Sequence, residues 1–373
     1  MPKLAFVVTE DWFFASHFLP MARAAVGMGL EVVVIARVRD HAAAIEATGA
    51  RVRPLEAERR SLNPLAAGAT VARLAAILRA ERPDIVHCIS LKSILVGGAA
   101  CALAGLSARV FALTGMGFLG AKADRTGRAA RWALRRLIRG PLSSRRTHFV
   151  FENEDDPKLL GLDPAARDVT ILGGAGIDPA AYPASPLPPG ETLRIALVAR
   201  MLWSKGIDTA VEAVTAARAR GVDATLSLFG APDPSNPKAI PLETLRDWSS
   251  RSGIAWHGPT RSVAKVWREH HAACLPSRGG EGLPRTLLES AACGRPSLTT
   301  DVPGCRSFVR DGVDGFVVPV DDAAALADAI GRLAADRSLA ERMGAAAAAR
   351  VRDGFTEADV MARIEDVYRS LLR

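Results

Sequence analysis

Arg200 and Lys205 have the types and spacing expected of a site for a diphosphate. They follow an apolar segment that we expect to be a strand, and they precede a segment of helical period. A guanidinium and an ammonium both suit a diphosphate. Fixed positive charge at that place also stabilises the negative charge that a nucleotide diphosphate gains as a leaving group. Two surface cations at the start of a helix are the alternative interpretation.

A second pair of charged residues, Glu281 and Glu289, lies between Pro276 and Gly304. A glycine-rich loop carries Glu281, and Pro284 suits the first turn of a helix whose N-terminal N–H groups favour a phosphate. Glu289, just past that turn, is suited to accept hydrogen bonds from vicinal hydroxyls such as those of a ribose, and Glu281 is suited to meet a second polyol. Solvated acids on an ordinary strand–loop–helix unit are the alternative.

The sequence offers no obvious site for a metal or a redox cofactor. It has no D-x-D motif and no histidine cluster, so we expect a metal-independent site that needs no cofactor. The five cysteines contain no C-x-x-C pair, which predicts reduced, mostly buried thiols. No G-x-G-x-x-G follows the first predicted strand, which disfavours a dehydrogenase.

The positive charge of the chain is concentrated in one segment. The net charge is +8, and residues 122–146 alone carry an excess of that size, interleaved with apolar side chains. This composition is typical of a basic amphipathic helix on an anionic membrane surface. A solvated arginine-rich face is the alternative, and a nucleic-acid partner is disfavoured because no recognition motif lies nearby. The residues predicted to contact the membrane are Arg128, Arg131, Trp132, Arg135, Arg136 and Arg139.

The elements that must position these residues alternate along the chain between short apolar runs and longer helical segments. This pattern predicts an α/β protein with two doubly wound, Rossmann-like domains of parallel strands. Four prolines in residues 183–190 interrupt the pattern. We therefore predict an N-terminal domain over 1–183, a linker over 184–191, a C-terminal domain over 192–355 and a helix over 356–373 that crosses back to the first domain. Ligands bind beyond the carboxyl ends of such strands, so we expect the site in a cleft between the domains.

Nothing in the sequence predicts a membrane-spanning segment. The longest uncharged apolar run, Ile94 to Leu106, is shorter than the roughly 20 residues that a spanning helix needs. Met1 leads directly into a strand-like segment without the features of a signal peptide. We expect a cytoplasmic protein that associates peripherally with the inner face of the plasma membrane.

Together these segments resemble the retaining glycosyltransferases of family 4, which have the GT-B fold. The likeness covers nearly the whole chain and is closest to the capsular and exopolysaccharide branch. Its marks in the second half are Arg200 with Lys205-Gly206, Gly174-Ala175-Gly176-Ile177-Asp178, Glu281-Gly282-Leu283-Pro284, Glu289 seven residues beyond Glu281, and Asp301-Val302-Pro303-Gly304-Cys305. The marks of the branch are Asp84-Ile85-Val86-His87, Lys92, Thr114-Gly115-Met116-Gly117 and Phe151-Glu152-Asn153-Glu154-Asp155-Asp156.

The resemblance implies a role for each matching residue. Arg200 and Lys205 would hold the donor diphosphate, Glu281 would contact hydroxyls of the transferred sugar, and Glu289 would bind the ribose. The backbone of Gly282, Leu283 and Pro284 would approach the sugar and phosphate. The family retains the anomeric configuration, generally without a metal, and the departing phosphate helps to deprotonate the acceptor.

Some residues depart from the family pattern or match it only by position. Ala175 replaces a serine, and an extra glycine precedes Glu281. His257 ends a predicted strand and is expected to border the nucleotide base. His17, Lys92 and Thr114 are predicted to face the acceptor, although His17 is also compatible with facing the donor or with a structural role.

The sequence thus predicts a glycosyltransferase that moves a sugar from a nucleotide diphosphate donor, UDP-linked, to a polyprenyl-diphosphate-linked saccharide. The alternative is a nucleotide-sugar epimerase, or a phosphorylase, of the same two-domain shape. A non-catalytic binder of sugar nucleotides is disfavoured because the donor cations and Glu281 are all present.

Overall fold

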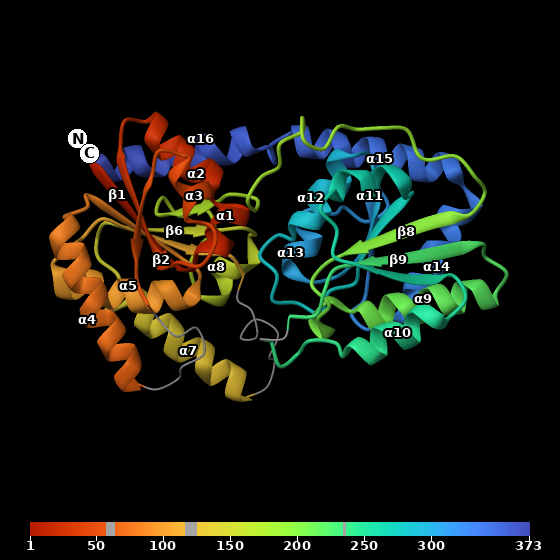
Figure 1. Ribbon diagram of the computed structural model, residues 1–373, viewed down its shortest axis with the longest axis horizontal. Helices are drawn as coiled ribbons and strands as arrows, with labels where there is room; N and C mark the ends of the chain where they lie inside the picture. Colours follow the sequence, from red (N-terminus) through yellow and green to blue (C-terminus); the bar gives the residue numbers. More distant parts are fainter. Residues whose placement is uncertain (57–63, 116–124, 234–235) are drawn as a thin grey trace. The chain divides into compact units, whose positions relative to one another are not determined.

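The computed structural model describes residues 1–56, 64–115, 125–233 and 236–373 (Figure 1). They form two compact units, one of residues 1–175 with 357–373 and one of residues 176–356. The proline-rich segment predicted as a linker is hydrogen bonded inside the second unit. There Arg295 donates to the carbonyl oxygens of Ser185 (2.8 Å) and Pro186 (3.0 Å).

The first unit is built on a parallel seven-stranded sheet in the order β3-β2-β1-β4-β5-β6-β7. Its strands alternate in the faces to which their side chains point, so Ala5 and Val7 of β1 enter one apolar core while Leu4 and Phe6 enter another. The strands are β1 (Lys3–Glu10), β2 (Glu31–Arg37), β3 (Arg51–Pro54), β4 (Ile85–Ile89), β5 (Arg109–Leu113), β6 (Thr147–Phe151) and β7 (Val169–Ile171).

Helices cover both faces of this sheet. The core with Leu4 and Phe6 receives side chains from α1 (Asp11–His17), α2 (Leu19–Gly27), α3 (Ala42–Glu46) and α16 (Glu357–Leu372). The core with Ala5 and Val7 receives side chains from α4 (Pro64–Glu81), α5 (Leu91–Ala104) and α7 (Arg125–Arg139). A short helix, α8 (Asp155–Leu159), follows β6.

The predicted return of the C-terminal helix to the first domain is confirmed. Tyr368 of α16 is fully buried, and its hydroxyl lies 2.7 Å from Nδ1 of His87, which is also fully buried in β4. Burial lowers the pKa of His87 to about 3, so this imidazole is neutral and acts as a core residue.

The second unit repeats the design with a parallel six-stranded sheet in the order β10-β9-β8-β11-β12-β13. Its strands are β8 (Leu193–Val198), β9 (Ala224–Phe229), β10 (Ile254–Gly258), β11 (Ala272–Leu275), β12 (Ser297–Thr300) and β13 (Gly315–Val318). Its helices are η1 (Trp203–Lys205), α9 (Ile207–Ala219), α10 (Leu242–Ser250), α11 (Val263–Glu269), α12 (Arg285–Ala292), α13 (Pro303–Arg306), α14 (Ala323–Ala335) and α15 (Arg337–Arg352). The predicted α/β class with two doubly wound sheets is confirmed.

Two further predictions from the sequence concern the cysteines and membrane-spanning helices. All five cysteines are free and buried, as expected for reduced core thiols. In the described ranges, each helix is too short or too polar to cross a bilayer.

Candidate active site

A tight turn brings Lys205 to the loop that follows β11. In the second unit β8 lies beside β11, so the segments after these two strands meet at the same edge of the sheet. Gly206, directly after η1, has φ +67°, and a Cβ on it would lie 1.9 Å from the carbonyl oxygen of Pro276. Only glycine allows this approach and this left-handed conformation together. The position of Lys205 therefore depends on Gly206.

Lys205 forms an ion pair with Glu281, and the loop after β11 carries that carboxylate. The distance from Lys205 Nζ to Glu281 Oε1 is 2.5 Å, and the side chains are only 15% and 17% exposed. The hydroxyl of Ser277, a buried residue, donates to the same carboxylate oxygen at 3.1 Å. An ammonium has three donors, so Lys205 has the capacity to hold this carboxylate and a phosphate at once.

The loop is held in place from both sides. Gly279 and Gly280 both have positive φ, +113° and +79°, so the extra glycine in this loop is part of the bend that carries Glu281. On the other side Gly304, in α13, presses against the loop. A Cβ on Gly304 would lie 2.1 Å from the carbonyl oxygen of Gly282.

Glu289 of α12 is a nearly buried carboxylate, 8% exposed. The Tyr182 hydroxyl donates to it at 3.0 Å and Arg285 Nε donates at 3.1 Å. Burial outweighs these donors and raises the pKa of Glu289. Burial and the neighbouring Glu289 carboxylate also raise the pKa of Tyr182. The sequence does not indicate this role of Tyr182, because Tyr182 lies 107 residues before Glu289 and no spacing connects the two.

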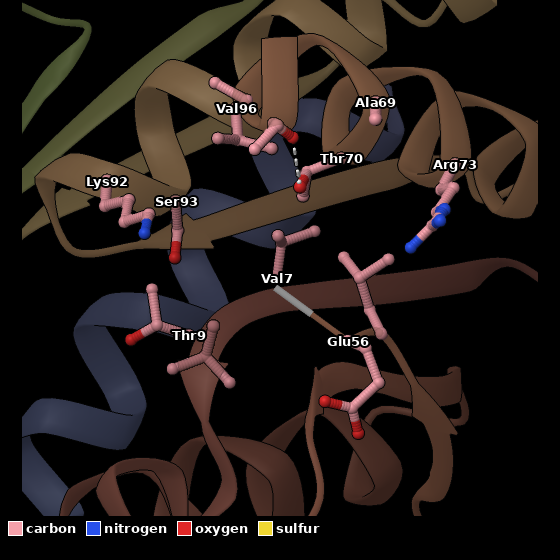
Figure 2. Close-up of a pocket in the computed structure, with 13 residues that line it drawn as sticks. Val7, Thr9, Glu56, Ala69, Thr70, Arg73, Lys92, Ser93 and Val96 are labelled. Atoms are coloured by element: carbon pink, nitrogen blue, oxygen red, sulfur yellow. Dashed lines mark hydrogen bonds between the residues drawn. The ribbon is translucent and has the colours of Figure 1, made fainter. Parts of the chain in front are cut away.

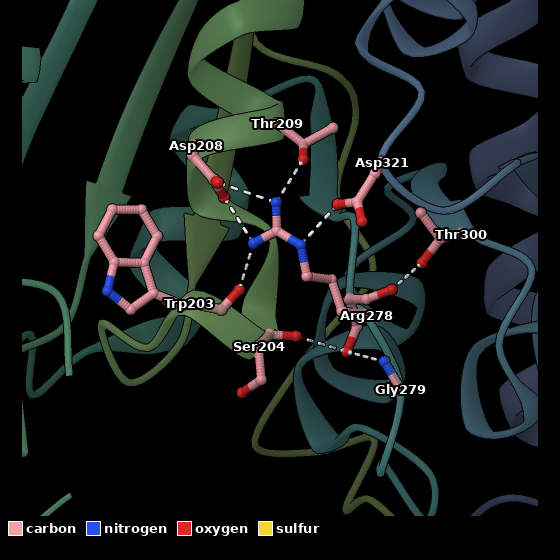
Figure 3. Close-up of polar contacts among 9 residues, drawn as sticks. Trp203, Ser204, Asp208, Thr209, Arg278, Gly279, Thr300 and Asp321 are labelled. Carbon is pink, nitrogen blue, oxygen red and sulfur yellow. Dashed lines mark hydrogen bonds and ion pairs between the residues drawn. The ribbon is translucent and has the colours of Figure 1, made fainter. Parts of the chain in front are cut away.

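Arg278 joins the loop after β11 to the turn that carries Lys205 (Figure 3). Its guanidinium donates to both carboxylate oxygens of Asp208 at 2.8 Å, to Asp321 at 2.5 Å and to the carbonyl oxygen of Trp203 at 2.5 Å. Its backbone N–H donates to the carbonyl of Ser204 at 2.9 Å. The hydrogen bond to Asp208 is the main reason that the pKa of Arg278 is raised.

The role of Arg278 is likewise not indicated by the sequence, although this residue lies within the glycine-rich stretch. The only available signal was a cation inside that loop, and nothing in the spacing indicated that Asp208 is its partner. Arg278 fastens η1 and the start of α9 to the loop, so it helps to hold Lys205 against Glu281.

Arg200 and Lys205 have different ion-pair partners in the structure. Arg200 follows β8, is 49% exposed and has Asp233 as an ion-pair partner at 3.4 Å. His257, at the carboxyl end of β10, is exposed and stacks on Phe229 with ring centroids 4.8 Å apart and an interplanar angle of 16°. Leu283 and Pro284, which lead into α12, are buried.

The residues predicted to face the acceptor all lie in the first unit. His17 ends α1, with Nδ1 2.6 Å from the Ser16 hydroxyl and its ring beside Phe13. Lys92 is in the first turn of α5, where it lines a cavity. Thr114 is half-buried, directly after β5. Residues 116 and 117 of the motif that begins at Thr114 lie outside the described residues.

The basic segment forms an amphipathic helix, α7. Its apolar side buries Leu134 and Ile138 in the core, whereas Trp132 is 65% exposed and Leu137 is 47% exposed. Among the arginines predicted to contact a membrane, Arg131 is half-buried and the others are exposed; these are Arg128, Arg135, Arg136 and Arg139. The Arg136 guanidinium lies 5.6 Å from the Trp132 ring centroid, and Arg139 donates to the Gly161 carbonyl at 2.8 Å. Residues 122–124 lie outside the described residues.

Across the described part of the chain, no three His, Cys, Asp or Glu side chains are grouped in a way that would hold a metal ion. What the second unit does assemble is a cation, a carboxylate and a buried second carboxylate around one glycine-rich loop. Chemically, this set is suited to bind a phosphate and the hydroxyls of sugars.

Comparison with known proteins agrees with this chemistry. Residues 3–147 match the family model "Glycosyl transferase 4-like", and residues 192–336 match the model "Glycosyl transferases group 1". The two models together span most of the chain. The protein belongs to the glycosyltransferases and is an enzyme of that class, with the GT-B fold.

Among curated proteins, the chain is 31% identical over 152 residues to "Exopolysaccharide phosphotransferase SCO2592" of Streptomyces coelicolor, a match that covers 40% of this chain and 16% of the relative. It is 24% identical over 338 residues to the N,N'-diacetylbacillosaminyl-diphospho-undecaprenol alpha-1,3-N-acetylgalactosaminyltransferase of Campylobacter jejuni, with 87% of each chain covered. Among solved structures, HepE of Anabaena in complex with UDP-glucose superposes with a TM-score of 0.80 at 15% identity, over 99% of this chain and 100% of that one.

Proposed function

We propose that this enzyme is a retaining glycosyltransferase that moves a sugar from a UDP-linked donor to a polyprenyl-diphosphate-linked saccharide. The reaction would serve surface polysaccharide or glycan synthesis at the inner face of the plasma membrane. The observation that carries the proposal is the Lys205–Glu281 pair, held between two turns at the edge of the second sheet. The family models are those of glycosyltransferases, which favours transfer over epimerisation.

In this proposal, different residues of the second unit bind different parts of the donor. Lys205 and the exposed Arg200 neutralise the diphosphate, aided by N–H groups at the start of α12. Glu281 accepts hydrogen bonds from hydroxyls of the transferred sugar, and Glu289 accepts them from the ribose. The stacked ring pair of His257 and Phe229 offers an exposed aromatic face to the base.

In the proposed reaction, an acceptor hydroxyl attacks the anomeric carbon as the bond from that carbon to the diphosphate oxygen breaks. The hydroxyl proton passes to the departing diphosphate on the same face of the sugar, so the anomeric configuration is retained. Lys205 stabilises the charge that develops on the diphosphate. Glu281, already paired with Lys205, binds the sugar and does not act as a covalent nucleophile.

The acceptor is inferred from α7 and from relatives. An amphipathic helix with exposed arginines and an exposed tryptophan is suited to an anionic membrane surface, where a polyprenyl lipid resides. The name of the Campylobacter relative describes transfer to a sugar on undecaprenol diphosphate, and HepE was solved with UDP-glucose. The first name supports a lipid-linked acceptor, and the second supports a UDP-sugar donor.

The test is sugar transfer by the full chain, with a panel of UDP-sugars and a polyprenyl-diphosphate-linked saccharide in vesicles that contain phosphatidylglycerol. Lys205→Ala and Glu281→Ala should each lower kcat by about 100-fold, the order of magnitude for loss of a charge-stabilising group. Lys265→Ala is the matched control, because this lysine is 63% exposed in a surface ion pair with Glu269.

The outcomes separate the two candidate functions. Wild-type rates in both site variants would refute the assignment of the site, and an epimerised UDP-sugar without any transfer would favour the alternative. For the membrane, the double variant Arg135→Glu with Arg136→Glu should detach the protein from the vesicles and leave UDP binding unchanged. Undiminished vesicle binding would refute the role of α7.

A further inference from the structure

The first unit contains a cavity of about 250 Å³ at the carboxyl end of β1 (Figure 2). Val7, Ala69 and Val96, contributed by β1, α4 and α5, are among its apolar lining residues. Lys92 borders it at one end and Arg73 at the other. The described lining is more aliphatic than polar, with a cation at each end, and it also includes the Glu56 carboxylate and the hydroxyls of Thr9 and Ser93.

The cavity exists because the first turns of α4 have small side chains. Residues 66–69 of this helix are alanine and glycine, whereas its later turns place Leu74 and Leu78 in the core. The hydroxyl of Thr70, which also lines the cavity, donates to the Ala66 carbonyl at 2.9 Å within the same helix. Small side chains therefore form the α4 wall of the cavity, and the Thr70 hydroxyl on that wall is already hydrogen bonded within the helix.

These walls fit an aliphatic chain better than a sugar. Among the described residues, the lining has no aromatic ring and no side-chain amide, and its one carboxylate, Glu56, forms an ion pair with Arg37 at 3.6 Å. Lys92, in the first turn of α5, is well placed to attract an anion at the end of such a chain. The volume is below the roughly 300 Å³ of the smallest pockets that enclose a whole ligand, so only part of a chain fits.

The cavity also lies on the face of the sheet that carries the basic helix. Val7 belongs to the same apolar core as Leu134 and Ile138 of α7. A lipid at a membrane bound by α7 would therefore be on the same side of the sheet as the cavity.

We infer that this cavity binds the isoprenyl units next to the diphosphate of the lipid acceptor, with Lys92 toward the diphosphate. The inference rests on the proposed function, since it identifies where that acceptor is held. It predicts that the enzyme recognises the lipid itself as well as the saccharide.

The experiment measures binding of farnesyl diphosphate and of inorganic pyrophosphate to the full chain by calorimetry, below the critical micelle concentration. Ala69→Leu and, independently, Ala66→Leu fill the cavity from a helix surface that is not buried, so both should fold. Ala76→Leu is the matched control, because this alanine is exposed on the same helix and does not line the cavity.

The cavity-filling variants should bind farnesyl diphosphate about tenfold more weakly, as expected when about two methylene groups lose their burial, and should bind pyrophosphate as the wild type does. Lys92→Gln should weaken the binding of both ligands. In the transfer assay, Ala69→Leu should raise KM for the lipid acceptor and leave KM for the donor unchanged.

Equal affinity of the wild type for farnesyl diphosphate and pyrophosphate would overturn the inference. So would unchanged farnesyl diphosphate affinity in both cavity-filling variants, or loss of that affinity only in the Arg135→Glu, Arg136→Glu variant. Because the binding measurement needs no sugar transfer, weak prenyl binding with normal transfer refutes the cavity alone. Normal prenyl binding without transfer refutes the proposed reaction instead.

Discussion

Replacing Arg278 with lysine tests whether the contacts of this residue position Lys205, the cation of the proposed donor site. The lysine keeps the positive charge but loses the planar fork that spans Asp208, Asp321 and the Trp203 carbonyl. We expect η1 to separate from the loop after β11. Lys205, the last residue of η1, would then shift away from Glu281.

The magnitude follows from the exposure of the partners. Arg278 and Asp208 are 28% and 25% exposed, so their paired hydrogen bonds are moderately shielded, whereas Asp321 is 57% exposed and contributes little. Loss of the second bond to Asp208 and of the bond to Trp203 should cost about 2 kcal/mol of unfolding free energy. For a unit of this size, that lowers the melting temperature by about 4–8 °C.

The assay combines scanning calorimetry with steady-state transfer kinetics. In the proposed reaction Lys205 acts on the leaving diphosphate, so its displacement should lower kcat by about tenfold or more. Arg251→Lys is the control, since Arg251, directly after α10, forms an exposed ion pair with Asp247 of that helix and its replacement should cost less than about 0.5 kcal/mol. A fall in melting temperature with unchanged kcat would show that Arg278 is purely structural, and identical behaviour of the two variants would refute both parts of the reasoning.

Two further substitutions test the second unit. Glu289→Gln removes a buried charge whose pKa is raised by burial, so it should raise the melting temperature near neutral pH while it weakens UDP binding. The stability advantage of Glu289→Gln over the wild type should vanish as the pH falls through the raised pKa, because the wild-type carboxyl then becomes neutral too. An advantage that grows as the pH falls would contradict a buried, charged Glu289. Gly304→Ala places a Cβ 2.1 Å from the Gly282 carbonyl oxygen and should abolish transfer. Gly331→Ala in helix α14 is the control, because its Cβ would lie no closer than 3.9 Å to another residue, so it should retain activity and stability. Normal transfer by Gly304→Ala would show that the loop carrying Glu281 can shift without loss of function, and it would refute the need for this close packing.

The sequence predicted the elements of the site better than their contacts. It located Lys205 after a strand and Glu281 in a glycine-rich loop, because strand–loop–helix patterns are local. It treated Arg200 and Lys205 as one pair, yet in the structure their ion-pair partners are different acids, Asp233 and Glu281. Spacing along a chain does not specify the direction of a long side chain.

Tyr182 and the Arg278–Asp208 contact were not predictable in the same way. Each joins segments whose separation follows no local period, 107 and 70 residues in these two cases. The cavity of the first unit was not predictable either. In the sequence, the alanines at the start of α4 indicate only a helix, and the cavity depends on how that helix packs against β1 and α5.

By itself the sequence determined the alternating α/β pattern, the amphipathic basic helix and the charged residues available for a diphosphate, because periodicity and composition encode which faces are buried. Only the tertiary structure decided which of those residues meet. The physical reason is strand order: β8 pairs with β11 although two strands, β9 and β10, lie between them in the chain, and that pairing sets Lys205 beside Glu281.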